Sequence, residues 1–337
     1  MRRFIKWAFG GFAYQKLSKL KQFIKNVLDL ITNFLYDGLL FYRHSMVFKK
    51  NSFNKIEAQI ILNYHSIEKG FLHDEFKYRF GETHIKELIQ LLRNNSIIKH
   101  TNRTQIAAAF LALCTYYEKH QAGHVDISDF FPRKDYDMFK SRSTLNCNVF
   151  LENKYESFSR ASTDNFFDFS HLRSSIRSFT GELIPFELIT KAIDLAKTAP
   201  SVCNRQATKV YYLDNKIKIE TILNIQNGLK GYFDGISQLL IVVTDRNYFY
   251  SIGERNQMFI DGGVFLMNLL YALNFYKIGA CPAHWAFTKG YDKLIMEELN
   301  LKNSEKVLCL IAIGVPKGNY RTTLSLRRET SEILVVR

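Results

Sequence analysis

Two polar clusters in the second half of the chain carry side chains that suit an anionic, polyhydroxylated ligand. The first contains Arg173, Ser174, Ser175 and Arg177, and the second runs from Pro200 to Gln206 with Ser201, Asn204 and Gln206 as its polar members. Guanidinium groups offer forked donors to a phosphate, and neighbouring hydroxyls offer short ones. The amide and hydroxyl groups of the second cluster could hydrogen-bond a polyol or a heterocycle. The plainer alternative is a capped helix followed by a polar turn.

An apolar-rich helix is expected between the two clusters. Pro185 and Glu187 are typical of a first helical turn, and apolar side chains then recur at helical spacing as far as Lys197. Ala199-Pro200 ends the helix, because the residue before a proline disfavours helical backbone. The two clusters would therefore lie at opposite ends of one helix.

The order of three motifs resembles the opening of the nitroreductase family of FMN-dependent oxidoreductases. The motifs are R-x-S-x-R-x-F, I-P-x-E-x-[LI] and A-P-S-x-x-N-x-Q, and the resemblance continues over roughly the last half of the chain. It implies an α+β fold with a central, mostly antiparallel sheet flanked by helices, and a bound FMN. It also implies NAD(P)H as a transient electron donor, a small-molecule electron acceptor, and a homodimer. The family usually has arginine where this chain has Ser174, and proline where it has Ala207.

The resemblance assigns cofactor contacts by position. The phosphate and ribityl end would be held by Arg173, Ser174, Ser175 and Arg177, and the flavin of the partner subunit by Pro200, Ser201, Asn204 and Gln206. The pyrimidine edge would meet Asn227 and Lys230, where positive charge stabilises the anionic reduced ring. One flavin face would be covered by a loop with Pro282, Ala283, His284 and Trp285, and the phosphate would be reached by Arg327, with Arg328 as the alternative.

His284 is the titratable group of this expected loop that could donate a proton during catalysis. The alternative, which we favour from sequence, is a loop histidine stacked beside Trp285. No G-x-G-x-x-G motif follows a strand, which fits a nicotinamide that binds only transiently.

Hydrophobic patterns predict the elements that position these residues. Strands are expected at Lys209–Leu213, Leu239–Thr244 and Val307–Gly314, and helices at Lys218–Asn227 and Gln257–Phe275. The Gln257–Phe275 helix is apolar over a wide face, and the resemblance places it in a dimer core.

The first half is expected to be a mainly helical, basic region, residues 1–165, followed by an FMN-binding domain, residues 166–337. Helices are predicted over residues 4–41, 52–70, 84–93 and 104–120, and residues 124–170 read as a connection. The 52–70 helix resembles, more loosely, an extension of nitroreductase-like proteins linked to surface polysaccharide synthesis. That implies a role in polysaccharide biosynthesis, and the alternative is a non-catalytic flavin-fold scaffold in the same assembly.

Positive charge is concentrated at the N-terminus. The chain has a net charge of +14, and residues 1–50 contain ten basic residues against two acids. We expect the helix over residues 4–41 to pack on the rest of the protein, and the alternative is peripheral membrane contact through residues 1–45. Nucleic-acid binding is disfavoured, because the lysines interleave with apolar positions and no nucleic-acid motif is present.

Five scattered cysteines form no C-x-x-C pair, and no Cys/His spacing suits zinc. Free thiols in a reducing cytoplasm are the simplest interpretation, so we expect a cytoplasmic protein without a metal. With 28 Phe and 18 Tyr in 337 residues, the chain has ample apolar material for a packed core.

Overall fold

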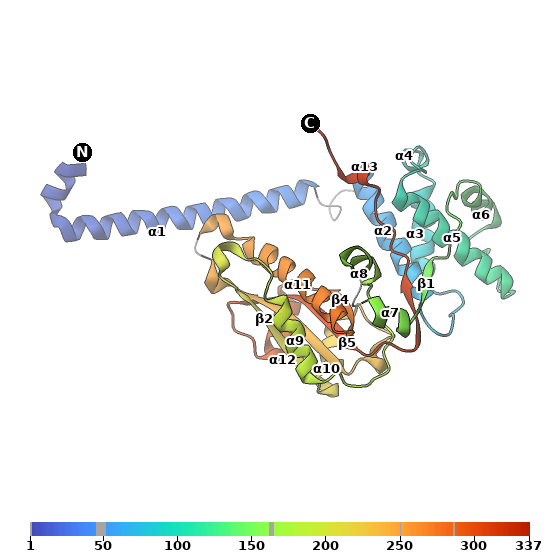
Figure 1. Cartoon of the computed structure of the whole chain (residues 1–337). Helices are drawn as coiled ribbons and strands as arrows, with labels where there is room; N and C mark the ends of the chain where they lie inside the picture. The colour runs from blue at the N-terminus through green and yellow to red at the C-terminus, as the bar shows by residue number, and fades with distance from the viewer. Residues whose placement is uncertain (1, 45–51, 162–164, 250, 286) are drawn as a thin grey trace.

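The protein consists of one long helix, a group of short helices, and a layered body around a sheet (Figure 1). We call residues 53–140 the helical body and residues 173–316 the sheet body. The computed structural model describes residues 2–44, 52–161, 165–249, 251–285 and 287–337, with no side-chain description for residues 2–14, 40, 41, 43, 44, 95, 160 and 161. Lys49 and Lys50, which belong to the basic segment, lie outside the described residues, as does the chain at 162–164 beside the expected domain boundary.

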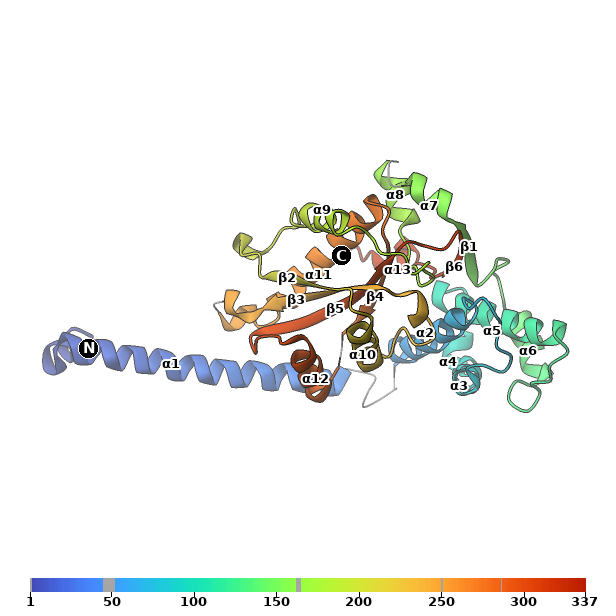
Figure 2. The ribbon, with the colours of Figure 1, turned by 90° about the horizontal axis from the view of Figure 1, so that it is seen from below.

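The N-terminal helix α1 spans Arg2–His44, and its N-terminal part projects away from both bodies (Figures 1 and 2). Side chains from Gln15 to Leu39 are exposed, apart from half-buried Asp29, Asn33 and Asp37. The expectation that this helix packs on the rest of the protein is therefore wrong. The helix is formed as predicted, but its apolar side chains find no partner among the described residues.

The helical body has its own apolar core. Its helices are α2 (Phe53–Gly70), α3 (Glu82–Leu92), α4 (Asn95–Ile98), α5 (Thr104–Ala122) and α6 (Arg133–Lys140). Ile60 and Ile67 of α2, Leu88 of α3 and Phe110 of α5 meet in one buried cluster. The three longer helices were expected from sequence within a few residues, because each carries apolar side chains at helical spacing.

The sheet body is built on four antiparallel strands in the order β2-β3-β5-β4. They are β2 (Thr208–Leu213), β3 (Gln238–Asp245), β4 (Gly279–His284) and β5 (Glu305–Gly314). The central strands β3 and β5 are buried along nearly their whole length, which explains their almost continuous apolar sequences. The antiparallel α+β architecture expected from sequence is confirmed.

Helices cover both faces of this sheet, as the view along its edge shows (Figure 2). One face carries α9 (Phe186–Ala196) and α11 (Gln257–Phe275), and the other carries α10 (Lys216–Gln226) and α12 (Lys289–Leu299). Leu240 and Val242 point to the first pair, whereas Leu239 and Ile241 point to the second. This alternation follows from the two-residue period of a strand.

Helix α11 is long and apolar enough to cross a membrane by composition, with a mean hydropathy of 1.4. It packs on α9 and on the sheet through Leu269, Leu270 and Leu273. Those contacts are typical of a core helix, which passes the same compositional test.

Residues 124–170 are not the plain connection that the sequence suggested. They contain α6, the strand β1 (Phe150–Lys154) and the helices α7 (Tyr155–Ala161) and α8 (Phe166–Leu172). Strand β1 pairs with β6 (Asn319–Thr323), so that Phe150 lies opposite Thr323. The sequence could not show this, because the pairing joins segments far apart in the chain.

The C-terminal tail returns along the helical body after β6 and includes the short helix α13 (Thr330–Ile333) (Figure 1). Buried Glu57 of α2 accepts from Arg103 at 3.0 Å and from Arg328 at 2.6 Å. Leu324 and Leu326 pack against the core of the helical body. The tail is therefore fixed on the first half of the chain, while the strand that precedes it borders the sheet body.

Candidate functional site

The first arginine cluster opens into a cavity of about 390 Å³ that is lined mainly by the segment after α8 and by the C-terminal part of the chain. Arg173, Ser174 and Ser175 contribute from the segment that follows α8, and Arg327 contributes from the C-terminal tail. The remaining lining residues are Leu151, Ser170, His171, Tyr271, Thr322, Thr323, Leu324 and Ser325. Hydroxyl groups and two guanidinium groups thus converge on one space, which is the chemistry expected of a phosphate site.

The described residues that line this cavity carry positive charge, and none of them carries a balancing negative charge. Arg173 and Arg327 carry positive charge, and the described lining residues include no carboxylate. Burial lowers the pKa of the Arg173 guanidinium, and the positive charge of Arg327 lowers it further. Two like charges held beside each other in a partly buried site favour an anionic ligand.

Backbone contacts hold the arginine segment beside the edge strand of the sheet. The amide of Ile176 donates to the carbonyl of Ala280 in β4 at 3.0 Å, and Phe179 forms an isolated bridge with Pro316. Ile176 and Phe179 are buried in the core beneath the sheet. Because these apolar side chains are anchored, Arg173 and Ser175 are fixed relative to β4.

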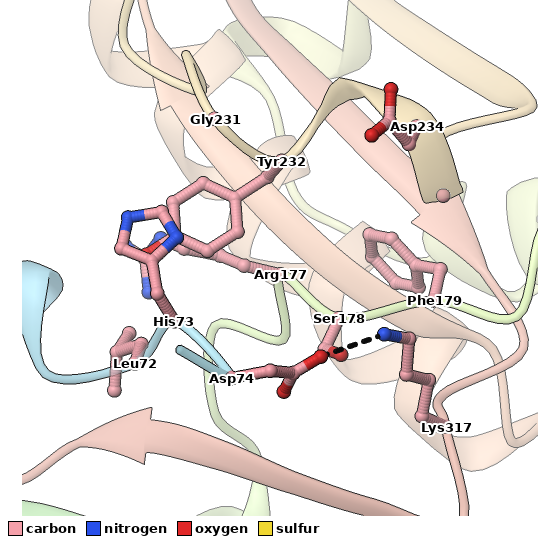
Figure 3. A pocket seen from close by; sticks show the side chains of 11 residues that line it. Leu72, His73, Asp74, Arg177, Ser178, Phe179, Gly231, Tyr232, Asp234 and Lys317 are labelled. Carbon is pink, nitrogen blue, oxygen red and sulfur yellow. Dashed lines mark hydrogen bonds and ion pairs between the residues drawn. The ribbon is translucent and has the colours of Figure 1, made fainter. Parts of the chain in front are cut away.

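Arg177 does not line the cavity of Arg173, contrary to the prediction that both hold the same phosphate and ribityl end. It lines a second pocket of about 200 Å³, with His73, Tyr232 and Lys317 (Figure 3). One of its guanidinium nitrogens donates to the carbonyl of Ser175 at 3.3 Å, and its Nε is buried without a hydrogen-bond partner. An orphaned buried donor of this kind is expected at a site that binds a ligand.

The helical body supplies residues to this second pocket, and sequence reasoning missed them. The ring of His73 stacks on Tyr232 with 4.7 Å between centroids (Figure 3). The hydroxyl of Tyr232 donates to the carbonyl of Lys69 at 2.9 Å. Burial lowers the pKa of the Lys69 ammonium, and the charge of Arg177 lowers it further. No local sequence motif could have joined residue 69 to residue 177, because only the fold brings them together.

The second polar cluster forms a tightly constrained loop around η1 (Val202–Asn204). Cys203, Asn204 and Gln206 all have positive φ, at 49°, 55° and 50°. This backbone region costs L-residues about 1–2 kcal/mol each, although asparagine tolerates it better. Such strain is characteristic of functional loops whose surroundings hold them in place.

Side-chain contacts hold that loop. Arg205 donates to both carboxylate oxygens of Glu254 at 2.8 and 2.9 Å, and the amide of Gln206 donates to the hydroxyl of Ser201 at 3.1 Å. Pro200, Ser201 and Gln206 line a third pocket, and the side chain of Asn204 is exposed. Within one chain this loop and the Arg173 cavity do not share a pocket.

The segment expected as a loop over the flavin is a strand. Pro282, Ala283 and His284 belong to the edge strand β4 and pair with β5. Proline is tolerated there because an edge strand leaves one side of its backbone unpaired. The helix α11 ends at Phe275, as predicted, and a short turn leads directly into the strand.

His284 and Trp285 have different environments. His284 is exposed and lies parallel to Phe287 at 6.4 Å between ring centroids. Trp285 is 5% exposed and donates its Nε1 proton to Asp292 at 2.7 Å. The side chain of Trp285 is therefore part of the core, and the ring that lies parallel to His284 is Phe287, not Trp285 as the favoured alternative had it.

A buried glutamine joins the end of α10 to the end of β4. Gln226 is 3% exposed, donates to the carbonyl of His284 at 3.2 Å and accepts from the amide of Gly228 at 2.7 Å. Asn227 caps α10 with a φ of 61°, and Lys230 follows on the exposed surface. The two segments expected to contact the ring are thus linked to each other.

Arg328 is not a phosphate ligand in this structure, because it is directed to buried Glu57. Arg327, the preferred choice from sequence, lines the Arg173 cavity. Within the part of the chain that the structure describes, no cluster of three or more His, Cys, Asp or Glu side chains could hold a metal ion.

Residues 172–230 match the model of the nitroreductase family. The segment includes both polar clusters and the α9–α10 portion of the sheet body, so the resemblance stated from its motifs is confirmed. Together with the antiparallel sheet it defines a nitroreductase-like α+β domain preceded by a helical region.

Solved structures with similar folds cover about half of the chain. An FMN-dependent nitroreductase from Clostridium difficile is 18% identical over 48% of this chain and 90% of its own, with a TM-score of 0.38. A nitroreductase-like protein from Streptococcus mutans is 19% identical over 49% and 94%, with a TM-score of 0.42. A Desulfovibrio desulfuricans protein in complex with FMN is 21% identical over 52% and 98%, with a TM-score of 0.44. Comparison with curated proteins gives no match.

Proposed function

We propose that the protein is an FMN-dependent oxidoreductase that passes hydride from NAD(P)H through bound flavin to an electron-poor small molecule. The observation that carries this proposal is the acid-free cavity in which Arg173 and Arg327 meet several hydroxyl groups. The family match of residues 172–230 supports the flavin as the ligand.

The residues of the cavity fit the phosphate end of FMN. A phosphate would accept from both guanidinium groups and from Ser174, Ser175 or Thr323. Its negative charge would offset both the burial of the Arg173 guanidinium and its repulsion by Arg327, which together lower the pKa of Arg173. Each charge-assisted hydrogen bond of this type contributes about 1.5–3 kcal/mol.

The pocket that Arg177 lines would act on the ring. A bound flavin supplies the hydride chemistry, and the chain supplies orientation and electrostatics. Arg177, with its unpaired Nε and with Lys69 beside it, would stabilise negative charge on the reduced ring. The family resemblance assigns this role to Lys230, which is exposed and stays a candidate for contact with the pyrimidine edge of the flavin.

His284 is the proposed proton donor to the acceptor. Its side chain is exposed at the end of β4, and Gln226 fixes its backbone carbonyl. An exposed imidazole can exchange protons with water between turnovers.

We also propose that the active form is a homodimer. Helix α11 exposes Phe259, Ile260, Val264 and Met267 on the side away from the sheet. A Cβ placed on Gly263 would meet no described atom within 4 Å, which leaves room for the close approach of another helix. The Ser201–Gln206 loop, which lines its own pocket, would then serve the flavin of the partner subunit.

The looser resemblance of α2 to polysaccharide-associated extensions motivates a role in surface polysaccharide synthesis, in the cytoplasm. The rival is a flavin-fold scaffold without turnover. It is favoured by His73, which stacks on Tyr232 and takes up space beside Arg177.

The absorbance spectrum of the purified protein with and without NAD(P)H separates these proposals. An oxidoreductase should show bound oxidised flavin, lose its visible band with NAD(P)H, and regain it when a quinone or nitroaromatic acceptor is added. A flavin that NAD(P)H does not bleach supports the scaffold. Protein that stays colourless after incubation with FMN contradicts the oxidoreductase.

A further inference from the structure

The long helix α1 presents a continuous apolar surface to solvent. Eleven aliphatic or phenyl side chains between Leu17 and Leu39 are each at least 37% exposed. They are Leu17, Leu20, Phe23, Ile24, Val27, Leu28, Leu30, Ile31, Phe34, Leu35 and Leu39. A surface of this size on a soluble chain marks a binding surface.

These side chains occupy one side of the helix. With 3.6 residues per turn, all eleven fall within about half of the circumference, and the apolar face is about 33 Å long. The opposite half carries polar residues such as Gln22, Asn26 and Asn33. The helix is therefore amphipathic along this whole segment.

The polar half of α1, not its apolar face, attaches the helix to the sheet body. Asp29, Asn33 and Asp37 are spaced by four residues and are half-buried. Asp37 accepts two hydrogen bonds from Arg255, at 2.7 and 3.0 Å, next to η4 (Ile252–Glu254). This attachment leaves the apolar side chains of α1 exposed to solvent.

The basic residues lie where an anionic surface would require them. Lys21 and Lys25 border the apolar face on one side and Lys19 borders it on the other, and all three are exposed. A lysine at such a border can bury its methylene groups and keep its ammonium among lipid headgroups. Phosphate and carboxylate headgroups would provide the negative charge that this part of the helix lacks.

A second copy of α1 is a weaker candidate for the partner. A coiled-coil seam uses a narrow stripe of apolar residues, whereas this face covers about half of the helix. In a parallel pair the lysines at 19, 21 and 25 of the two helices would also lie close together and repel.

We propose that α1 docks the protein on an anionic membrane surface, lying in the plane of the interface with its apolar face in the lipid. Charged residues recur along the Leu17–Leu39 segment, so this segment cannot cross the bilayer as a transmembrane helix. The proposal does not depend on flavin chemistry.

Co-sedimentation of the full-length protein with vesicles tests the proposal. The vesicles contain either phosphatidylcholine alone or phosphatidylcholine with phosphatidylserine. We expect binding to the mixed vesicles that weakens with salt. Each of Lys19→Gln, Lys21→Gln and Lys25→Gln should weaken the partition coefficient roughly fivefold. The matched control replaces Lys216, Lys218 and Lys293, exposed lysines of α10 and α12, by Gln and should bind like the wild type.

A second pair of variants tests the orientation. The double variant Ile24→Asp with Ile31→Asp places two carboxylates in the apolar face and should abolish vesicle binding. The double variant Gln22→Asp with Asn26→Asp places them on the polar face and should reduce binding only by repulsion from the anionic headgroups. Circular dichroism confirms that each variant keeps its helix. Absence of binding to mixed vesicles overturns the proposal, as does binding that the three lysine substitutions leave unchanged. Self-association that Ile24→Asp abolishes, without vesicle binding, would assign the face to a second copy instead.

Discussion

Arg173 and Arg327 line the same cavity, although Arg173 begins the sheet body and Arg327 lies beyond its last strand. Their meeting depends on the return of the tail along the helical body, where Arg328 is bound to Glu57. The N-terminal half of the chain therefore has a structural role in the candidate cofactor site. It holds the segment that completes the phosphate cavity.

Glu57→Gln tests that dependence. Glu57 is 2% exposed and receives both Arg103 and Arg328, so the substitution removes the compensating charge from two arginines. We expect a loss of about 2–4 kcal/mol in the free energy of unfolding by urea, and faster proteolysis of the tail after β6. Glu82→Gln, which breaks a surface pair with Lys86, should cost less than about 1 kcal/mol. Equal effects of the two substitutions would contradict the anchoring role.

Gln226→Ala should loosen the connection between α10 and β4. The variant leaves the carbonyl of His284 and the amide of Gly228 without the partner that now satisfies them. The expected destabilisation is about 1–3 kcal/mol, with faster hydrogen exchange at Gly228. Asn224→Ala, at an exposed position of the same helix, is the control. If both variants melt at the same temperature as the wild type, the glutamine does not hold these segments together.

His120 should make the helical body sensitive to acid. Burial lowers its pKa, and its Nε2 accepts from the amide of Arg79 at 2.8 Å while its Nδ1 donates to the carbonyl of Tyr116. The neutral ring therefore contributes stability that is fully present above the unfolded-state value of about 6.5 and is lost as pH falls through the lower folded-state pKa. Thermal denaturation across pH 7 to 5 should show a steeper fall for the wild type than for His120→Gln. His124→Asn, at an exposed position with a φ of 56°, should keep the wild-type slope.

Ile260→Asp with Val264→Asp should separate the proposed dimer. Both side chains are exposed on α11, at 57% and 40%, and a carboxylate there would be costly to bury between subunits. Light scattering after gel filtration should give twice the chain mass of 39.4 kDa for the wild type and a single chain mass for the variant. Leu294→Asp, on α12 at the other face of the sheet, should stay dimeric. A monomeric wild type would remove the proposed role of the Ser201–Gln206 loop toward a partner.

The elements that could be predicted from sequence are those whose patterns are local. The limits of α11 and the positions of β3 and β5 follow from runs of apolar residues, and α9 follows from Pro185 and Ala199-Pro200. The family resemblance assigned Arg173, Ser175 and Arg327 to the phosphate end of the cofactor, and the structure places all three in one cavity. This prediction was possible because the motifs are defined by local residue spacing.

The elements that escaped prediction depend on contacts between distant segments. Strand β1 exists because it pairs with β6, and Lys69 lies beside Arg177 only because the end of α2 meets the sheet body at Tyr232. The outward apolar face of α1 could not be predicted either, since periodicity shows that a helix has an apolar face but does not show what covers it.

Titration with FMN and with riboflavin, which lacks only the phosphate, tests the central claim most directly. If Arg173 and Arg327 bind the phosphate, the wild type should bind FMN far more tightly than riboflavin. Arg173→Ala and Arg327→Ala should each weaken FMN binding about 10-fold to 100-fold and leave riboflavin binding nearly unchanged. Arg246→Ala, which removes an exposed arginine that contacts the carbonyl of Ser304, is the matched control. Equal affinity of the wild type for the two flavins, or an equal loss of both in the arginine variants, would contradict the assignment of this cavity.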